Sequence, residues 1–451
     1  MNTMNIYNKL PIFAQNMACA LEGRRLAALR YGGLFESNLA TYMANRELSG
    51  NEVAEIRNDK LRSMVRYCYD NTKFYKERFD ECGIDPRSVR DERDLSSLPI
   101  LTKAEVRERA QDIVPFDRAV VGKSISEHTS GSTGSSLVFG QSVDNLRDLW
   151  AVFWRFWYSL GIERGTLCAD FGSRLVVPSA QSMPPFWRSC SPLGQVKFSA
   201  FHGNEANYAS YVHEFDDAGL QWIHGYPSCI VPFAAYVLEH GVEFKKPIKY
   251  VTTSAENLYD HQRALIKKAF GVEPFSLYAL TEAVACISER ADHELVVDED
   301  YSLVEFVPSE GGHKIIGSNL TNYAFPLLRY DTGDICSYSD KYSNGWRVVD
   351  FIDGRNAELV RLPDGGTVGA LSALFTESSS VKEAQIVQHP DFSVTISYVS
   401  IGEKDADDIE VARRKFTERT RGLLPVDFKK VEAIPRTSRG KLRYVVSEIE
   451  K

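Results

Sequence analysis

The residues of this chain best suited to chemistry are hydroxyl and glycine residues in one short segment, Thr129-Ser130-Gly131-Ser132-Thr133-Gly134-Ser135. Its glycines let the backbone turn tightly, so successive N–H groups and hydroxyls can point at one anion without obstruction by side chains. The triphosphate of a nucleotide is such an anion. Because Ser/Gly/Thr clusters are also ordinary turns, this segment alone predicts only an anion site.

A second candidate for phosphate binding, Gly122-Lys123-Ser124, can be set aside. A Walker-type loop with this ending would need a glycine at position 117, where this chain has Asp117. The sequence therefore argues against a P-loop NTPase.

Four further segments with suitable chemistry follow the hydroxyl loop along the chain. They are Tyr278-Ala279-Leu280-Thr281-Glu282, Tyr330-Asp331-Thr332-Gly333-Asp334, Gly354-Arg355 and Pro435-Arg436-Thr437-Ser438-Arg439-Gly440-Lys441. A carboxylate is a hard oxygen ligand for Mg²⁺, a flat ring can cover a purine, and an ionised acid can accept hydrogen bonds from both ribose hydroxyls. Each segment alone is equally typical of a strand end or a turn, so their shared order carries the interpretation.

In this order the segments resemble the motifs of the acyl-adenylate-forming superfamily, which includes acyl-CoA ligases, luciferases and nonribosomal adenylation domains. The resemblance implies that Thr129 to Ser135 binds the phosphates of ATP. It also implies that Tyr278 packs on adenine, that Thr281 touches phosphate and that Glu282 holds Mg²⁺.

The same resemblance assigns the remaining nucleotide contacts. Asp334 matches the carboxylate that binds ribose, and Arg355 matches the arginine at the ribose or phosphate. The segment Ser254-Ala255-Glu256, expected between a strand and a helix, aligns with the one that runs along the adenine.

The C-terminal segment resembles the superfamily's most specific signature, and it makes Lys441 the expected catalytic cation. Attack of a carboxylate on the α-phosphorus brings two anions together, and a positioned ammonium can neutralise that charge. The alternative, a solvated lysine in a basic tail, is disfavoured by the other motifs.

Within the superfamily, the chain is most similar to the phenylacetate-CoA ligase branch, especially to shorter proteins associated with capsular polysaccharide gene clusters. The residues that carry this likeness are Arg30-Tyr31-Gly32-Gly33, Leu98-Pro99-Ile100-Leu101-Thr102-Lys103, Gly225-Tyr226-Pro227-Ser228 and Gly365. The likeness implies that ATP and a carboxylic acid give acyl-AMP and pyrophosphate, after which a thiol such as coenzyme A takes the acyl group.

The chain also departs from that branch. Cys286 and His293 match part of a Cys/His set that resembles a zinc site, but Phe351 and Asp353 replace its Cys-x-Cys pair, so we expect no structural zinc. After Gly354-Arg355 come Asn356-Ala357-Glu358 and then Leu362-Pro363-Asp364-Gly365, in a stretch that flanks the thiol tunnel in relatives that use coenzyme A. An amine, a hydroxyl or a carrier protein therefore remains an alternative acceptor.

Two further functional hypotheses remain open. One is an adenylyltransferase that moves AMP onto a hydroxyl, and the other is a nucleotide-binding protein without chemistry. Retention of Glu282, Asp334, Arg355 and Lys441 favours the ligase.

The acid is not specified by the sequence, but its pocket has candidate wall residues. These are Tyr226, Trp154, Trp157 and Ala279, and aromatic walls would fit an aryl or other planar acid. Trp150, Phe153, Trp154 and Trp157 recur at helical spacing, for which packing in the core is the favoured interpretation over pocket lining.

Hydrophobic periodicity predicts the elements that position these residues. The first hundred residues are expected to be mainly helical, and β-rich runs then alternate with helices from Trp222 to Tyr278. Strands and turns follow from Tyr301 to Val349 as a distorted barrel or sheet. We predict an α/β fold with a large adenylate-forming domain at 1–353, a small mobile α+β lid at 354–451, and a hinge at Asp353 to Asn356.

Composition limits the partners and the compartment. A formal net charge of -8 argues against nonspecific nucleic-acid binding, and eight scattered cysteines without a C-x-x-C pair are typical of a reduced, cytoplasmic protein. No stretch approaches the roughly 18 apolar residues of a membrane span. We expect Ile12, Met17, Leu21 and Leu26 to pack on their own domain rather than to lie on a membrane. The oligomeric state is not specified.

Overall fold

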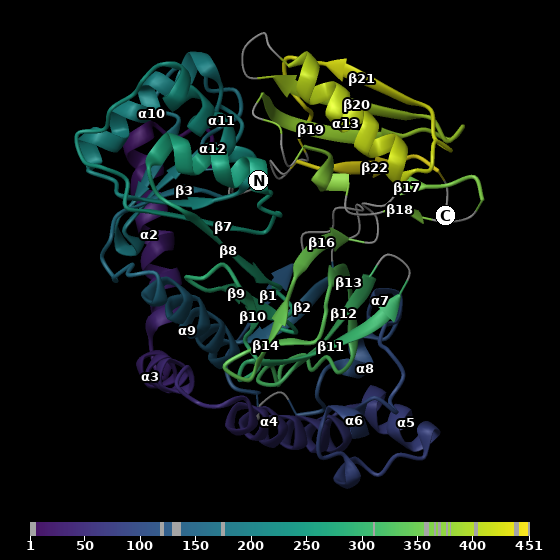
Figure 1. Cartoon of the computed structure of the whole chain (residues 1–451). Helices are drawn as coiled ribbons and strands as arrows, with labels where there is room; N and C mark the ends of the chain where they lie inside the picture. The colour runs from purple at the N-terminus through teal and green to yellow at the C-terminus, as the bar shows by residue number, and fades with distance from the viewer. Residues whose placement is uncertain are drawn as a thin grey trace. The chain divides into compact units, whose positions relative to one another are not determined.

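The computed structural model describes residues 6–117, 121–128, 137–172, 176–309, 312–355, 360–364, 367–368, 371–375, 378, 380–400, 405–436 and 442–449 (Figure 1). Only the backbone is described at residues 353–355, 367, 372 and 373. Contacts between Cα atoms group the chain into two compact units, which are described separately. The first unit comprises residues 1–25, 162–276 and 353–451, and the second comprises residues 26–161 and 277–352.

In the first unit, residues 162–276 form strands with helices packed on them. The strand order is β4-β5-β3-β6-β7, in which β5, β3, β6 and β7 run parallel and β4 is antiparallel to β5. The strands are β3 (Cys168–Phe171), β4 (Trp187–Cys190), β5 (Gln195–Phe198), β6 (Trp222–Gly225) and β7 (Tyr250–Ser254). The helices are η3 (Ser191–Leu193), α10 (Glu205–Ala218), α11 (Pro227–Glu239) and α12 (Asp260–Phe270).

Aromatic side chains hold these helices to the strands. Phe171 and Phe198 stack with ring centroids 5.0 Å apart, and both rings contact Phe215 of α10. Phe233 of α11 is fully buried in the same cluster. This packing fixes the carboxyl ends of β6 and β7, where ligands bind in parallel α/β sheets.

The C-terminal part of the first unit has its own core. Its strand order is β21-β20-β19-β22 (Figure 1). Ile386, Ile396 and the helix residue Phe416 belong to one buried cluster. The sheet and its helix are β19 (Val381–Gln388), β20 (Val394–Ser400), α13 (Ala406–Arg419), β21 (Val426–Lys430) and β22 (Val445–Ser447). Smaller elements precede them: β17 (Val360–Arg361), β18 (Thr367–Val368) and η5 (Leu371–Phe375).

Helices dominate the start of the second unit. They are α3 (Phe35–Asn45), α4 (Gly50–Asn71), α5 (Lys73–Cys82), η1 (Pro86–Ser88), α6 (Glu92–Leu95), α7 (Lys103–Glu108), α8 (Ala110–Ile113) and α9 (Val143–Ser159). The first strands are β1 (Ser124–His128) and β2 (Val138–Ser142), which pair antiparallel. Ser49 and Glu52 form a capping box at the start of α4, which satisfies backbone N–H groups that the helix leaves unpaired.

Strands form the rest of the second unit in two sets. One has the order β8-β9-β10-β15-β14, and the other has the order β11-β12-β13-β16. The first set comprises β8 (Pro274–Ala279), β9 (Cys286–Glu289), β10 (Leu295–Val297), β14 (Lys341–Ser343) and β15 (Trp346–Val349). The second comprises β11 (Ser302–Ser309), β12 (Gly312–Asn319), β13 (Tyr330–Ser337) and β16 (Phe351–Arg355).

The predicted α/β class is confirmed, as are the helical beginning and the alternating elements that follow it. The strand expected at Trp346 to Val349 is β15, and the helix expected near Asp407 to Arg421 is α13. The division at residue 353 stays a prediction. Among the described residues, no helix is long and apolar enough to cross a membrane.

The expectation for the N-terminal apolar residues is wrong at three of four positions. On α2 (Ile12–Tyr31), Leu26 is buried, but Ile12, Met17 and Leu21 are exposed. At about 100° per residue Met17 and Leu21 point to the side of the helix roughly opposite Ile12 and Leu26, so the four residues cannot share one packed face.

Candidate functional site

The turn that follows β8 carries the predicted metal and phosphate residues. Tyr278 and Ala279 end the strand, and Ala279 pairs with Cys286 of β9. Thr281 and Glu282 then form a tight turn, closed by a hydrogen bond from the Ala283 amide to the Leu280 carbonyl.

Backbone strain marks this turn. Ala283 has φ 60°, a left-handed conformation that costs a non-glycine residue about 1 kcal/mol. The side chain of Glu282 is buried, and its backbone carbonyl accepts a hydrogen bond from Asn319 Nδ2 at 3.2 Å. The turn therefore places a buried carboxylate next to a strained backbone position, and such positions are frequent at ligand sites.

A hydrogen bond joins this turn's strand to the predicted ribose carboxylate. The hydroxyl of Tyr278 donates to Asp334 Oδ2 at 2.8 Å, across a separation of 56 residues. Burial, followed by the negative charge of Asp334, raises the pKa of Tyr278 well above its ordinary value, so the hydroxyl stays protonated.

The local backbone also shapes the Asp334 loop. Asp331 accepts from the amide of Gly333 at 2.9 Å, and Thr332 Oγ1 accepts from the amide of Asp334 at 3.1 Å. These short-range bonds replace regular strand pairing and orient the buried Asp334 side chain. A carboxylate with several acceptor positions can bind a ligand hydroxyl in addition to Tyr278.

The predicted adenine segment lies at the carboxyl end of β7, in the other unit. Ser254 ends the strand, and Ala255 has φ 64°, a second left-handed alanine beside a predicted ligand residue. Glu256 accepts hydrogen bonds from the amide and the hydroxyl of Ser228, both at 3.0 Å. The segment is thereby tied to the first turn of α11.

Tyr226, a predicted wall residue, precedes that helix. Its amide donates to the carbonyl of Phe171 at 3.3 Å, and Pro227 begins α11 at a position where a missing N–H costs nothing. The side chain of Tyr226 is 8% exposed. The pocket role of this residue stays a prediction.

Trp154 and Trp157 of α9 are buried in the second unit. Their rings meet edge to face with centroids 5.0 Å apart, and Tyr31 packs on Trp154 at 6.4 Å. This aromatic cluster favours the core interpretation of the tryptophan pattern.

Several predicted residues lie outside the described residues. The phosphate loop Thr129 to Ser135 and the catalytic candidate Lys441 are among them, and Arg355 is described only as the last backbone position of β16. Their roles stay predictions. Cys286 is fully buried, and His293 Nδ1 lies 2.7 Å from Glu289 Oε1.

The chain is similar in sequence to a protein family and to several known proteins. Residues 361–448 match the CapK C-terminal domain family. The chain is 26% identical to protein CapK of Staphylococcus aureus over 99% of both chains. It is 24% identical to the phenylacetate-coenzyme A ligase of Thermus thermophilus over 62% of this chain and 64% of that protein, and 23% identical to the Escherichia coli enzyme of that name over 69% and 73%.

The chain is related to CapK and to the phenylacetate-CoA ligases. The predicted resemblance to the phenylacetate-CoA ligase branch of the adenylate-forming superfamily is confirmed. Among solved structures, a 2-hydroxyisobutyryl-CoA ligase in the postadenylation state resembles the chain with TM-score 0.65 at 16% identity, covering 87% of this chain and 89% of that one. An anthranilate CoA ligase matches with TM-score 0.50 at 15% identity, covering 70% and 65%. These likenesses establish the fold.

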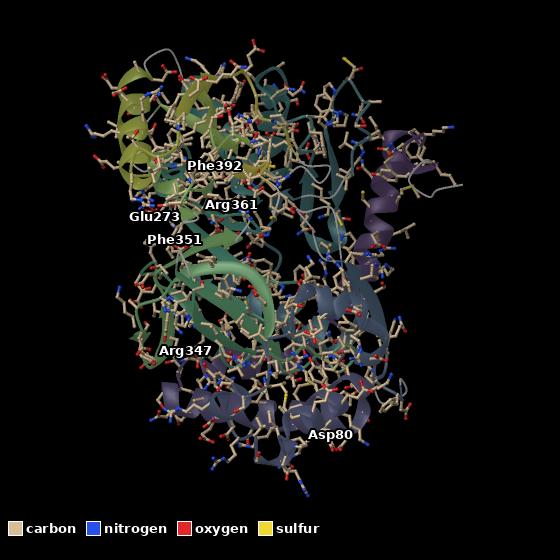
Figure 2. All side chains as sticks on the ribbon, turned by 90° about the vertical axis from the view of Figure 1, so that its right-hand side faces the viewer. Asp80, Glu273, Arg347, Phe351, Arg361 and Phe392 are labelled. Carbon is tan, nitrogen blue, oxygen red and sulfur yellow. The ribbon has the colours of Figure 1, made fainter. Side chains whose placement is uncertain are left out.

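A surface cavity of about 760 Å³ contains none of the predicted site residues. It lies between α4 and α5 and is bordered by Tyr69, Asp80 and Arg87, of which Asp80 is labelled in Figure 2. The Tyr69 hydroxyl donates to Asp80 Oδ1 at 2.8 Å, so the rim is held by its own polar contacts.

Sequence reasoning missed two features of the first unit. One is a row of polar residues at matching register across neighbouring strands: Lys197, Asp170, His224 and Thr252. The other is the pair of contacts that Arg436 makes with Glu383 and with the Ser228 carbonyl. The alternation of side chains along the strands could have indicated the polar row. The contacts of Arg436 could not be predicted, because no regular spacing in the sequence links the residues involved.

Proposed function

We propose that this protein is an acid–thiol ligase that uses ATP to convert a carboxylic acid to acyl-AMP. The hydrogen bond between Tyr278 and Asp334 carries the proposal, because it joins two motifs that are individually common. The strained turn at Ala283, beside Glu282, is a second support.

The first step forms a mixed anhydride. A carboxylate oxygen of the acid attacks the α-phosphorus of ATP, a new P–O bond forms, and the bond to the β-phosphate breaks with release of pyrophosphate. Asp334 accepts from the ribose hydroxyls, while the ring of Tyr278 covers the adenine. The ammonium of Lys441 offsets the charge of the two reacting anions.

The residues present fit a magnesium ion. Glu282 offers a carboxylate at a fixed turn, and carboxylate oxygens together with phosphate oxygens are the donors that Mg²⁺ prefers. Bound there, the ion would neutralise charge on the phosphates. Glu282 would hold it, with Thr281 placed beside it to contact a phosphate.

In the second step, the sulfur of a thiol attacks the acyl carbon, AMP leaves, and the thiol proton passes to solvent. Coenzyme A is the acceptor that we propose, since the ligases to which the chain is related are named for it. The replaced residues after Gly354-Arg355 favour an amine, a hydroxyl or a carrier-protein thiol as the second candidate.

A screen of carboxylic acids tests the proposal. Wild-type protein is incubated with ATP, Mg²⁺ and each acid, with and without coenzyme A, and pyrophosphate and acyl products are measured. We expect at least one acid to give pyrophosphate and a CoA thioester. Acyl-AMP that accumulates despite coenzyme A would favour the second candidate, and an adenylylated product without an acid requirement would overturn the ligase.

A further inference from the structure

The two ends of the lysine segment contact one small region of the first unit. Arg436 and Leu442 flank residues 437–441 and pair with each other in an antiparallel bridge. Arg436 donates to the Ser228 carbonyl, and the Leu442 amide donates to Glu256. Ser228 and Glu256 are themselves hydrogen bonded, so both ends reach the same connected pair.

From the described residues of this region, Glu256 accepts three hydrogen bonds. Its Oε2 takes the Ser228 amide at 3.0 Å, and its Oε1 takes the Ser228 hydroxyl at 3.0 Å and the Leu442 amide at 3.2 Å. Hydrogen bonds to an ionised acceptor are roughly twice as strong as neutral ones. One carboxylate therefore connects the adenine segment, the first turn of α11 and the residue next to Lys441.

Arg436 makes the second connection through a single nitrogen. Its Nη2 lies 3.0 Å from the Ser228 carbonyl and 2.6 Å from Glu383 Oε1 on β19. The Glu383 side chain is 8% exposed and that of Arg436 is 22% exposed, so the pair is largely shielded from water. A buried carboxylate without this partner would be costly, which favours the arrangement in which Arg436 is in place.

Packing next to these polar contacts reinforces them. The rings of Tyr259 and Tyr444 lie with centroids 5.1 Å apart, and the Gln385 side chain donates to the Arg443 carbonyl at 2.8 Å. The chain that follows the lysine segment is thus held by β19 and by the start of α12.

We propose that Glu256 and Arg436 are positioning residues for the first half-reaction: their contacts hold Arg436 and Leu442, the residues on either side of the Lys441 segment, beside the adenine segment. This proposal rests on the proposed function. Glu256 links the adenine segment to the residue after Lys441, because it accepts a hydrogen bond from the Leu442 amide. In the proposed function Lys441 acts in the first half-reaction, so the loss of these contacts affects the two half-reactions unequally.

Half-reaction kinetics test the proposal, using an acid from the screen. Glu256→Ala and Arg436→Gln should each slow acid-dependent ATP–pyrophosphate exchange at least about tenfold, since each removes hydrogen bonds to a charged group. Conversion of supplied acyl-AMP to thioester should stay within about twofold of wild type. Arg436→Lys should restore part of the exchange, because one ammonium can make both contacts of Nη2.

Matched control variants remove the same kinds of charge at sites away from the lysine segment. Arg421→Gln removes an exposed arginine paired with Asp364, and Asp216→Ala removes an exposed carboxylate that accepts from the Lys245 amide. Neither should change the exchange rate. Equal slowing of both half-reactions by Glu256→Ala or Arg436→Gln would overturn the positioning role, as would unchanged exchange.

Hydrogen exchange gives a readout that needs no acid. The Leu442 amide should lose protection at least about fivefold in Glu256→Ala but not in Asp216→Ala. Unchanged protection would overturn the contact itself. If wild type shows no acid-dependent exchange with any acid, the proposed function fails, while Leu442 protection still decides whether Glu256 holds the segment.

Discussion

At the scale of single residues, the site depends on ordinary side chains placed by a few unusual backbone positions. Ala283 and Ala255 both adopt left-handed conformations next to residues that the motifs single out. Such positions persist only where the surrounding structure enforces them. The strain at Ala283 is therefore a further support for the proposed ligand role of Glu282. Glu256 differs, because its carboxylate oxygens accept from Ser228 and Leu442.

Replacing Asp334 should weaken the use of ATP. Asp334→Asn keeps a partner for the Tyr278 hydroxyl but removes the charge that accepts the ribose hydroxyls. We expect kcat/KM for ATP to fall about tenfold to a hundredfold, in line with loss of roughly 1.5–3 kcal/mol for a hydrogen bond to a charged group. Steady-state pyrophosphate release measures it.

Two comparisons sharpen that result. Tyr278→Phe keeps the ring that we propose to cover adenine and keeps the charge of Asp334, so its effect should be smaller. Asp331→Asn changes a neighbouring carboxylate that pairs with Lys314 and should leave kcat/KM for ATP within about twofold. An Asp334→Asn enzyme with unchanged kcat/KM for ATP would remove Asp334 from the ribose site.

At this scale the sequence could identify the motif residues but not their partners. Tyr278, Glu282 and Asp334 stand in recognisable order, which made them candidates. Arg436 and Glu383 lie 53 residues apart, and no periodicity links them, because only the folded chain brings β19 to the lysine segment.

At the scale of elements, α9 shows how buried charge fixes a helix. Arg155 donates to Asp300 Oδ2 at 2.6 Å and to Asp298 Oδ1 at 2.8 Å, and its side chain is 4% exposed. Burial opposes the charged arginine, but the two carboxylates outweigh it and raise the pKa of Arg155. The helix is thereby joined to the turn that precedes β11.

Removing this arginine should destabilise the fold. Arg155→Leu leaves buried carboxylates without their partner, which typically costs about 3–5 kcal/mol. Arg147→Leu on the same helix breaks a pair with Asp144 in which the Arg147 side chain is 20% exposed and the Asp144 side chain 66% exposed, and it should cost about 0–1 kcal/mol. Chemical denaturation of both variants measures the difference, and equal costs would contradict the structural role of Arg155.

A buried histidine on α12 should make stability depend on pH. Desolvation lowers the pKa of His261 from 6.5 to about 4, so the unfolded chain binds a proton first as the pH falls. The contribution of His261 to the unfolding free energy is fully present above the pKa of the unfolded chain. It is lost as the pH falls toward the pKa of the folded protein. Between pH 7 and pH 5 this amounts to about 2 kcal/mol.

The variant His261→Phe isolates that contribution. Asp148 opposes it, because burial raises its pKa to about 6 and favours folding at lower pH. The difference between wild type and variant removes such background terms. We expect the variant to lose about 2 kcal/mol less unfolding free energy than wild type between pH 7 and pH 5; equal losses would show that His261 is not buried as a neutral base.

Element types were largely predictable because hydrophobic periodicity reports one buried face. β15 spans Trp346–Val349, as the sequence predicted, with a turn before it and a bend after it. The N-terminal helix was not predictable in the same way. Its apolar residues Met17 and Leu21 are exposed, and counting apolar residues without their angular positions concealed this.

At the scale of the whole molecule, likeness to CapK over 99% of both chains indicates that the entire architecture is shared. The family match at residues 361–448 covers the part that contains Lys441. The C-terminal part has its own buried core, so it could stay folded if it moved as a body. The mobility of this part stays a prediction.

The most direct test of the proposed chemistry is acid-dependent ATP–pyrophosphate exchange by the wild type and by Lys441→Ala. With an acid from the screen, the wild type should catalyse exchange, and the variant should be at least about tenfold slower with an unchanged melting temperature. Exchange by the variant at the wild-type rate, with the same acid dependence, would contradict the assignment of Lys441 and with it the proposed mechanism.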